Sequence, residues 1–580
     1  MPNNMDNIDV IVQLLKRNGI DHMVISPGGT NIALVKAVQD DPFFTCYSVV
    51  DERSAAYFAI GVYLQIGKPV AMCCTSAQAT RNYIPGLTEA YYKHVPLLAI
   101  CMQKHPRFTY QEYMQAPDQS SLPNDSVKES FTMPFVADVN DVYHSIRVAN
   151  QAMQELTHNG TGPVQLCVPW LDFPIGDAKP VVRDIRRYGV EDVWDLDLTG
   201  KKIMLVIGEH RPFNDQTHER IDSFCRQWGA IVYANLLSNF HSPYCVATNL
   251  LMSTLSKESF SGLAPDIVIT LGGQTGDYPL YKMLSKPEFS TIEHWRIAED
   301  GNVVDTYDKL VRVFQCSEDF FFERSCSDFT ESDIKNADYI NRWRECQSRL
   351  NTDVQIPFSN AAIAQYMSSR IPSGSVVQLA ILNSLRVWEL FEFDETIAFF
   401  SNVGAFGIDG GTSTLIGQSF ATDKLCIMIT GDLAFLYDIN ALSIRGIRSN
   451  VRVLLINNNG GFEFKLGIGH SKDTDRYIAA GDHFKTAKGW AQDCGFTYMS
   501  ATTMKEFVEH AEPFLAKSDT PIVFEVFVSD NNENEAYQHL MDANQVLSFS
   551  ESLKKNIKKT IKRAVGSETA RQISSSLKRK

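Results

Sequence analysis

The residues of this chain best suited to chemistry lie in the stretch 431–461, which begins with Gly-Asp and ends with three asparagines and two glycines. Asp432 follows one apolar run and Asn458 follows the next, so each is expected where a buried strand gives way to a loop. Carboxylate and amide oxygens are ligands that Mg²⁺ prefers, together with the oxygens of a bound phosphate. A Gly-Asp turn that leads into a helix also offers backbone N–H groups and a positive dipole end to a diphosphate. The stretch therefore predicts a Mg²⁺-diphosphate site; the alternative is a strand–helix–strand unit that merely turns at these residues.

A further candidate is Glu52, which lies between a predicted strand and a helix rich in small residues. Parallel sheets bind ligands at the carboxyl ends of their strands, which is where Glu52 is expected. A glutamate in an Asp-Glu-Arg tripeptide is by itself more often a solvated charge or the start of a helix, where negative charge is favoured. Its significance therefore depends on the rest of the chain.

Strands alternate with helices along most of the chain, which predicts an α/β protein with doubly wound parallel sheets. At 580 residues the chain is too long for one core, and about three domains are expected. The first and third of them have the same order of predicted elements, as two homologous halves would. We expect domains at residues 1–180, 181–345 and 346–545, followed by a tail at 546–580.

Two glycine turns of the middle domain could mark a nucleotide site. Gly208 ends one predicted strand, and Gly272-Gly273 ends another. No GxGxxG pattern follows either strand, so simple strand-end turns are the favoured interpretation. We therefore expect no flavin (FAD) in this chain.

Bulk properties argue against several classes of protein. The formal net charge of −14 disfavours nucleic acid as a general partner. No run of 18 or more apolar residues predicts a membrane span, and the polar, acidic residues 1–9 do not resemble an export signal. Twelve scattered cysteines without a CxxC pair suit reduced thiols, so a cytoplasmic location is expected.

Several motifs, ordered along the chain, resemble those of the thiamine diphosphate (ThDP)-dependent decarboxylases and carboligases, and most of all those of the menaquinone-pathway SEPHCHC synthases. The resemblance extends to about Asn544 and implies a pyrimidine-binding domain, a non-catalytic middle domain and a diphosphate-binding domain, in that order. It also implies a homodimer or homotetramer in which the first and third domains of different subunits enclose each cofactor. The motifs are SPG at 26–28, DERSAAYFAIG at 51–61, CTSAQATRNYIPGLTEA at 74–90, NS at 383–384, GAFGIDG at 404–410, GDLAFLYDINAL at 431–442 and INNNGG at 456–461.

The resemblance carries over the residues that bind the cofactor. Glu52 matches the catalytic glutamate that hydrogen-bonds the aminopyrimidine ring of ThDP. Asp432 and Asn458 match the side-chain ligands of Mg²⁺ (or Mn²⁺), and Gly460 matches the backbone ligand. Ile408 matches the bulky residue under the bent cofactor, although an ordinary core isoleucine is an equal alternative. The other expected cofactor contacts are Thr75, Ser76, Asn383, Ser384, Gly431, Leu433 and Ala434, of which Leu433 stands where many relatives have glycine.

The substrate side departs from the family pattern. At four positions where SEPHCHC synthases have arginine, this chain has Thr30, His105, Trp388 and Val403. Those arginines grip the carboxylates of 2-oxoglutarate and isochorismate, a task that suits a forked, permanently charged guanidinium. We therefore expect the fold and cofactor to be kept and the substrates to differ. Three more positions are expected near the substrate: Gln115, near the family's active-site glutamine, Arg386, which could compensate in part, and Glu463, which replaces an apolar residue.

The activity that the resemblance implies is that of a ThDP- and Mg²⁺-dependent transferase or lyase. Such an enzyme forms an acyl-anion (enamine) intermediate from a small-molecule 2-oxo acid. It either adds this intermediate to an acceptor, as a carboligase, or releases an aldehyde, as a decarboxylase. The alternative is a regulatory or scaffold protein that keeps the fold without catalysis; the presence of Glu52, Asp432 and Asn458 argues against it.

The C-terminal tail differs in charge from the rest of the chain. Residues 551–580 hold ten Lys or Arg and two Glu, a net charge of about +8, whereas the remainder carries about −22. Apolar residues recur every four positions between the basic ones, which predicts a basic amphipathic helix for an anionic membrane surface or an acidic partner. A solvated or subunit-bridging helix is the alternative. The apolar positions are Leu553, Ile557, Ile561 and Val565.

Overall fold

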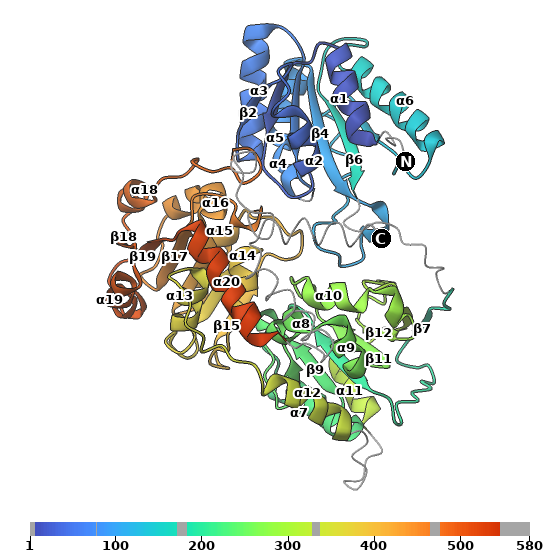
Figure 1. The fold of residues 1–580 in the computed structure, drawn as a ribbon, viewed down its shortest axis with the longest axis vertical. Coiled ribbons are helices and arrows are strands. Elements are labelled where there is room, and N and C mark those ends of the chain that lie inside the picture. Colours follow the sequence, from blue (N-terminus) through green and yellow to red (C-terminus); the bar gives the residue numbers. More distant parts are fainter. Residues whose placement is uncertain (1–5, 77, 171–181, 327–336, 465–475, 546–580) are drawn as a thin grey trace, which may run out of the picture.

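The computed structural model describes residues 6–76, 78–170, 182–326, 337–464 and 476–545. Within these residues the strands form three sheets of six, seven and six strands, and the recorded strand pairs are all parallel. Helices cover both faces of each sheet, which confirms the predicted α/β fold with doubly wound parallel sheets. Figure 1 shows the three layered bodies, the first in blue, the second in green and the third in yellow to red.

The first sheet has the strand order β2-β1-β3-β4-β6-β5. Its strand β4 is buried along its whole length, because helices pack on both sides of it. Helices α1, α2 and α6 share one apolar core with the sheet, and α3, α4 and α5 share the other. The strands are β1 (His22–Ile25), β2 (Thr45–Ser48), β3 (Val70–Cys74), β4 (Leu97–Lys104), β5 (Ser130–Thr132) and β6 (Val164–Trp170); the helices are α1 (Asn7–Arg17), α2 (Ile32–Val38), α3 (Glu52–Ile66), α4 (Gln78–Asn82), α5 (Ile84–Tyr92), the 3₁₀ turn η1 (Pro106–Phe108) and α6 (Val139–Glu155).

The second sheet has the order β10-β9-β8-β11-β12-β13-β7. Helices α8, α9, α10 and α12 cover one face, and α7 and α11 cover the other. At Gly208 an added Cβ would lie 1.7 Å from the carbonyl oxygen of Gly273, so glycine there lets two strand ends approach closely. The strands are β7 (Arg186–Tyr188), β8 (Ile203–Ile207), β9 (Ile231–Ala234), β10 (Cys245–Ala247), β11 (Ile267–Leu271), β12 (Glu293–Ile297) and β13 (Leu310–Phe314); the helices are α7 (Asp215–Trp228), η2 (Leu236–Ser238), α8 (Asn249–Thr254), α9 (Lys257–Leu263), α10 (Pro279–Leu284), η3 (Pro287–Phe289), α11 (Glu318–Ser325) and α12 (Ala337–Gln347).

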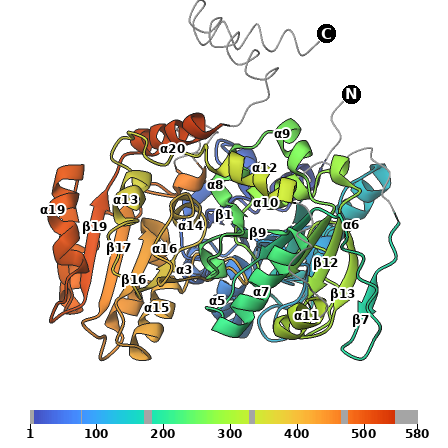
Figure 2. The same ribbon diagram turned by 90° about the horizontal axis from the view of Figure 1, so that it is seen from below.

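The third sheet, of order β15-β14-β16-β17-β19-β18, repeats the strand order of the first when each is numbered along its own part of the chain. This confirms the expected correspondence between the two halves. Helix α20 packs against α13 and also against α8 of the second body (Figure 2). The strands are β14 (Val376–Leu379), β15 (Ala398–Ser401), β16 (Cys426–Gly431), β17 (Val451–Asn457), β18 (Thr497–Ala501) and β19 (Ile522–Phe527); the helices are α13 (Asn360–Met367), α14 (Asn383–Trp388), α15 (Gly411–Phe420), α16 (Asp432–Tyr437), η4 (Ile439–Ser443), η5 (Phe462–Phe464), α18 (Lys488–Asp493), α19 (Met504–Leu515) and α20 (Asp530–Asn544).

Other expectations have separate outcomes. The domain boundaries stay a prediction; the strands of the three sheets fall at 22–170, 186–314 and 376–527. The tail at 546–580, with its predicted basic helix, lies outside the described residues. Among the helices that the structure describes, none has the length and apolar character needed to cross a membrane. All twelve cysteines lie in described segments, and all are free.

Candidate active site

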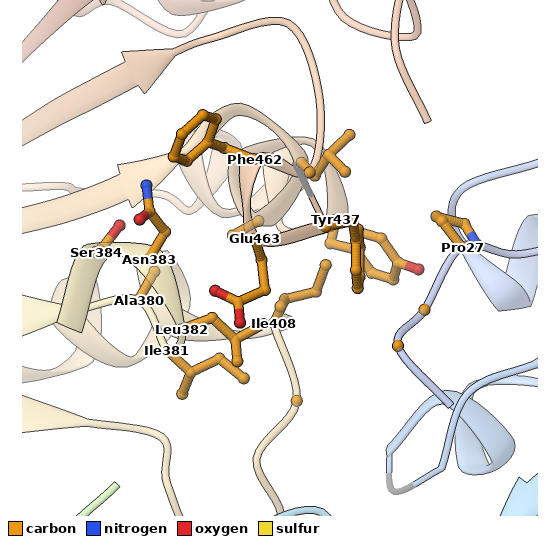
Figure 3. A pocket seen from close by; sticks show the side chains of 18 of the residues that line it. Pro27, Ala380, Ile381, Leu382, Asn383, Ser384, Ile408, Tyr437, Phe462 and Glu463 are labelled. Atoms are coloured by element: carbon orange, nitrogen blue, oxygen red, sulfur yellow. The ribbon is translucent and has the colours of Figure 1, made fainter. Parts of the chain in front are cut away.

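A cavity of about 280 Å³ lies where the first and third sheets meet, and residues from both bodies line it. Figure 3 shows Asn383 and Ser384 toward one side of this cavity and Pro27 toward the other, with Ile408 and Tyr437 between them. Open α/β sheets bind ligands in such places, just beyond the carboxyl ends of parallel strands. The wall is formed by loops that follow such strand ends: 27–29 after β1, 75–76 after β3, 380–384 after β14, 431–434 after β16 and 456–461 after β17.

Glu52 opens α3 and lies in the cavity wall with only 2% of its surface exposed. The single hydroxyl proton of Tyr437 is shared between Glu52 Oε2, at an O···O distance of 2.9 Å, and the backbone carbonyl of Val50. Burial raises the pKa of Glu52 to about 8, although its own backbone N–H and the Tyr437 hydroxyl act to lower it. A carboxyl group with this pKa can give or take a proton near neutral pH, as a general acid or base must.

Asp432 ties together the two loops that follow β16 and β17. Its Oδ1 accepts a hydrogen bond of 2.7 Å from the backbone N–H of Leu433, and its Oδ2 accepts one of 2.8 Å from Gly460. Gly460 has a φ of +138°, and an added Cβ would lie 2.8 Å from the carbonyl oxygen of Ala479. Glycine is therefore required for this close approach. Asp432 and Asn458 are both buried, and both line the cavity.

The donor set fits a Mg²⁺-diphosphate group. Asp432, Asn458 and Gly460 offer a carboxylate, an amide and a backbone carbonyl, which suit a hard cation better than a thiolate-seeking metal. The described residues hold no cluster of three or more His, Cys, Asp or Glu arranged for a metal; a site that uses one carboxylate and phosphate oxygens needs none. Within the same residues, Asn383 Oδ1 and Ser76 Oγ line the cavity buried and without a hydrogen-bond partner. A polar ligand in the cavity would relieve the cost of those unpaired atoms.

All the residues predicted to bind the cofactor and metal line this one cavity. Besides Glu52 and the three metal ligands they are Thr75, Ser76, Asn383, Ser384, Ile408, Gly431, Leu433 and Ala434. Gly28, in the loop after β1, also lines the cavity. An added Cβ there would lie 2.2 Å from the Cβ of Thr75, so this glycine lets the loops after β1 and β3 contact each other. The roles of these residues toward a cofactor stay a prediction.

The residues predicted near the substrate divide into two groups. Gln115 and Glu463 line the cavity. Arg386 forms a two-pronged ion pair with Glu463, at 2.5 and 2.9 Å. Arg386 itself does not line the cavity, and neither do the other four. The Thr30 hydroxyl hydrogen-bonds the Thr75 hydroxyl, and Trp388 and Val403 are buried in the apolar core of the third body. His105 caps η1, and its ring contacts that of Phe135.

Sequence reasoning missed several wall residues. Tyr437 lies in the GDLAFLYDINAL motif, but nothing in the sequence identifies Glu52 as its partner. Tyr278 belongs to the middle domain, which was expected to be non-catalytic, and its ring lies 5.9 Å from the Arg386 guanidinium carbon. Asn360, at the start of α13, also lines the cavity and accepts a hydrogen bond from the Trp388 indole. Trp388 stands where the related synthases have arginine, and this difference was the only feature of the sequence that pointed to the region around Asn360.

Comparison with known proteins gives one matching family model, two similar relatives and one similar solved structure. A family model described as the N-terminal TPP binding domain of thiamine pyrophosphate enzymes matches residues 5–122. The 2-succinyl-5-enolpyruvyl-6-hydroxy-3-cyclohexene-1-carboxylate synthase of Phocaeicola vulgatus is 32% identical over 568 residues, which cover 94% of this chain and 100% of that protein. The synthase of the same name from Bacteroides fragilis is 30% identical over 557 residues, 92% of this chain and 98% of the relative. A solved structure described as a thiamin diphosphate-dependent enzyme from Mycobacterium smegmatis has 17% identity and a TM-score of 0.40, covering 91% of this chain and 100% of its own.

Proposed function

Since the chain belongs to the thiamine diphosphate-dependent enzymes, in the family of the 2-succinyl-5-enolpyruvyl-6-hydroxy-3-cyclohexene-1-carboxylate (SEPHCHC) synthases, we propose that its cavity binds ThDP with Mg²⁺ and acts on a 2-oxo acid. When bound, ThDP supplies an acyl-anion equivalent by allowing a 2-oxo acid to lose its carboxylate as CO₂. The remaining acyl carbon would then be transferred to an acceptor, or would take up a proton and leave as an aldehyde. The protein contributes binding, orientation and proton transfer.

We assign the ends of the cavity as follows. Asp432, Asn458 and the backbone carbonyl of Gly460 would hold the metal against a diphosphate. Asn383 and Ser384, at the start of α14, would contact the same end. Glu52, on the first body, would face the aminopyrimidine ring of the cofactor. Manganese would satisfy the same oxygen ligands.

Glu52 is the residue that exchanges a proton with the cofactor. Because burial raises its pKa to about 8, its carboxyl is largely protonated at pH 7 and can donate a hydrogen bond to a ring nitrogen. Tyr437 holds one of its oxygens, which leaves the other to face the cavity. Replacement of the carboxyl by an amide removes this proton exchange while it keeps the size of the side chain.

One observation carries the proposal: Glu52 and Asp432, 380 positions apart in the chain, line the same cavity. A site with a metal-binding carboxylate and a separate proton-exchanging carboxyl is what ThDP chemistry requires. The strand order shared by the first and third sheets supports it, because two bodies of the same topology each present the carboxyl ends of their strands to the cavity. We found no structural feature that favours the regulatory or scaffold alternative.

The test has two stages. Isothermal titration calorimetry should detect ThDP binding that needs Mg²⁺ and is lost with EDTA. A panel of 2-oxo acids, with and without aldehyde and alkene acceptors, should then identify a donor through CO₂ release. Glu52→Gln should keep the fold and nearly abolish turnover, whereas Glu89→Gln, at an exposed glutamate of α5, should leave it unchanged. Wild-type turnover in Glu52→Gln, or no ThDP binding by the intact protein, would refute the proposal.

We also propose that the protein acts as a homodimer or homotetramer. Tyr57, Phe58 and Leu64 on α3 are 47%, 41% and 58% exposed and offer apolar surface to a second copy. The expected sharing of each site between subunits stays a prediction, since within one chain the two bodies already line one cavity. Mixing Glu52→Gln with Asp432→Ala protein tests it: restored activity requires shared sites, and its absence favours sites within single chains.

For the basic tail, we propose attachment to an anionic membrane surface at the inner face of the membrane. The support is its composition alone, about +8 in a chain of net charge −14. Vesicles that contain anionic lipid should retain more of the intact chain than vesicles without it. Equal retention of the intact chain and of a chain truncated at Ser550 would refute this attachment.

A further inference from the structure

Glu463 neutralises Arg386 at the cavity wall. Arg386 lies on α14 and Glu463 in η5, 77 positions later. Arg386 Nη1 donates to Glu463 Oε2 at 2.5 Å, and Nη2 donates to Oε1 at 2.9 Å. This forked geometry is the strongest form of an arginine–carboxylate contact. Figure 3 shows the Glu463 carboxylate beside Ile381 and Leu382, within the cavity.

The pair is held in a largely desolvated position. The side chains of Arg386 and Glu463 are 22% and 24% exposed. Burial alone would lower the pKa of Arg386, but the charge and hydrogen bonds of Glu463 outweigh it and leave that pKa above its ordinary value. The guanidinium is therefore charged, and its two terminal nitrogens are already bonded. Removing either partner would leave the other charge buried without compensation, which is costly.

The described part of the cavity wall offers no cation to a substrate. Among the described residues that line it, there is no Lys, Arg or His. Its carboxylates are Glu52, Asp432 and Glu463. The first two are assigned above to the cofactor and its metal. Most of the other side chains that line the cavity are neutral and apolar, among them those of Tyr278, Ile381, Leu382, Phe406, Phe462 and Phe464.

A substrate with a second carboxylate would meet an electrostatic obstacle here. That carboxylate would either stay unpaired beside Glu463 or displace Glu463 from Arg386. Both outcomes leave one negative charge desolvated without a partner. A 2-oxo acid whose remainder is uncharged avoids this cost, because its one carboxylate is the group that leaves as CO₂.

From the ion pair and the wall composition, and resting on the function proposed above, we infer that the donor is a 2-oxo monocarboxylic acid with an uncharged, mainly apolar side chain. The Arg386–Glu463 pair is then a specificity determinant that excludes dicarboxylic donors. Glu463 acts by occupying the arginine that such a donor would need.

The experiment compares two donors of similar size, 4-methyl-2-oxopentanoate and 2-oxoglutarate. Turnover is followed by CO₂ release, and binding by calorimetry in the Glu52→Gln background loaded with ThDP and Mg²⁺. The protein with the intact Arg386–Glu463 pair should prefer 4-methyl-2-oxopentanoate to 2-oxoglutarate at least tenfold, both in turnover and in binding. Glu463→Gln should free the positive charge of Arg386 and shift the preference at least tenfold toward 2-oxoglutarate. The double variant Glu463→Gln with Arg386→Met should lose that shift.

The outcomes separate the two proposals. If ThDP binds and 2-oxo acids turn over, but the unmodified protein shows no preference between the two donors or prefers 2-oxoglutarate, the inferred substrate class is wrong. The proposed function is not affected by that result. An unchanged preference in Glu463→Gln protein that melts as the wild type does also overturns the role of the pair. If ThDP does not bind the intact protein, the proposed function fails, and the substrate class fails with it.

Discussion

The hydroxyl of Tyr437 donates a hydrogen bond of 2.9 Å to the buried carboxyl of Glu52, and so joins two residues 385 positions apart. The one proton of this hydroxyl is shared with the carbonyl of Val50, and this second contact fixes the position of the hydroxyl. Glu52 is therefore oriented by the third body of the protein, although it belongs to the first. The orientation of the Glu52 carboxyl therefore depends on how the first and third bodies pack together.

Tyr437→Phe should raise the pKa of Glu52 further, because it removes a hydrogen bond that stabilises the carboxylate. A hydrogen bond to a charged group contributes about 1.5 to 3 kcal/mol, so a rise of about one to two units in the pKa of Glu52 is expected. The pH dependence of turnover and of ThDP affinity should both move upward by that amount. Turnover at pH 7 should fall, because the carboxyl is less well oriented.

The control for this variant is Tyr83→Phe. Tyr83 is also fully buried in the first body, and in the described structure its hydroxyl has no hydrogen-bond partner. The substitution removes the same atom without removing a bond, so the pH dependence should stay that of the wild type. Equal shifts in both variants would show that Tyr437 does not act through Glu52.

Asp432→Asn should weaken ThDP binding at least about 100-fold, because a neutral amide replaces the one carboxylate of the proposed metal site. An amide oxygen can still accept a hydrogen bond from Gly460, so the loop should keep its conformation. Calorimetry over a range of Mg²⁺ concentrations measures the effect. Asp423→Asn, at a carboxylate that is 95% exposed, is the matched control. Mg²⁺-dependent binding of wild-type strength in Asp432→Asn would remove Asp432 from the metal site.

The residues expected to bind the cofactor do line one cavity, and this could be predicted because strand periodicity governs where they lie. In a parallel sheet the carboxyl ends of the strands meet at one edge, so Glu52, Asp432 and Asn458 could be placed from strand boundaries and motifs alone. The alternation of strands and helices likewise predicted the doubly wound fold. All three residues line the same cavity.

Of the seven residues expected near the substrate, only Gln115 and Glu463 line the cavity, because this depends on which way single side chains point. Trp388 and Val403 align with family arginines, yet both are apolar and fill the core instead of the cavity. Tyr278 comes from the middle body, and its approach depends on how two bodies pack. The Arg386–Glu463 pair joins a helix and a loop across 77 positions, a relation that no local pattern encodes.

Arg452 should be a stability determinant of the third body. It lies on β17 with 1% of its surface exposed, and its nitrogens donate to the backbone carbonyls of Ser449, Val451, Phe514 and Ala516. Burial lowers the pKa of Arg452 to about 10. Arg452→Met should reduce the free energy of unfolding by about 3 kcal/mol or more, since it leaves buried carbonyls unpaired.

Urea denaturation of the protein measures this effect. Arg445→Met, at an exposed arginine in the loop before β17, should change the free energy of unfolding by less than about 0.5 kcal/mol. The ThDP affinity of folded Arg452→Met protein should stay that of the wild type, because Arg452 does not line the cavity. Equal stability of the two variants would show that the carbonyl contacts of Arg452 contribute nothing.

Glu533 should make the protein less stable as the pH rises. It lies on α20 with 3% of its surface exposed and accepts a hydrogen bond of 2.9 Å from the backbone N–H of Asn360. Burial raises its pKa from 4.5 to about 7, although the Asn360 bond acts to lower it. The folded state therefore binds more protons than the unfolded state between these two values. The free energy of unfolding contributed by Glu533 is fully present below the lower value and is lost as the pH rises through the upper one.

Glu533→Gln should remove this loss, because glutamine keeps an oxygen for Asn360 and cannot ionise. The free energy of unfolding of the variant relative to wild type should increase by about 2 kcal/mol between pH 5.5 and pH 8. Urea denaturation at the two pH values measures the difference, and other titrating groups cancel because both proteins share them. Glu535→Gln, at an exposed glutamate of the same helix, should show no such increase. If Glu533→Gln is instead destabilised equally at both pH values, Glu533 does not titrate in this range, and its carboxylate is stabilised by more than the Asn360 hydrogen bond.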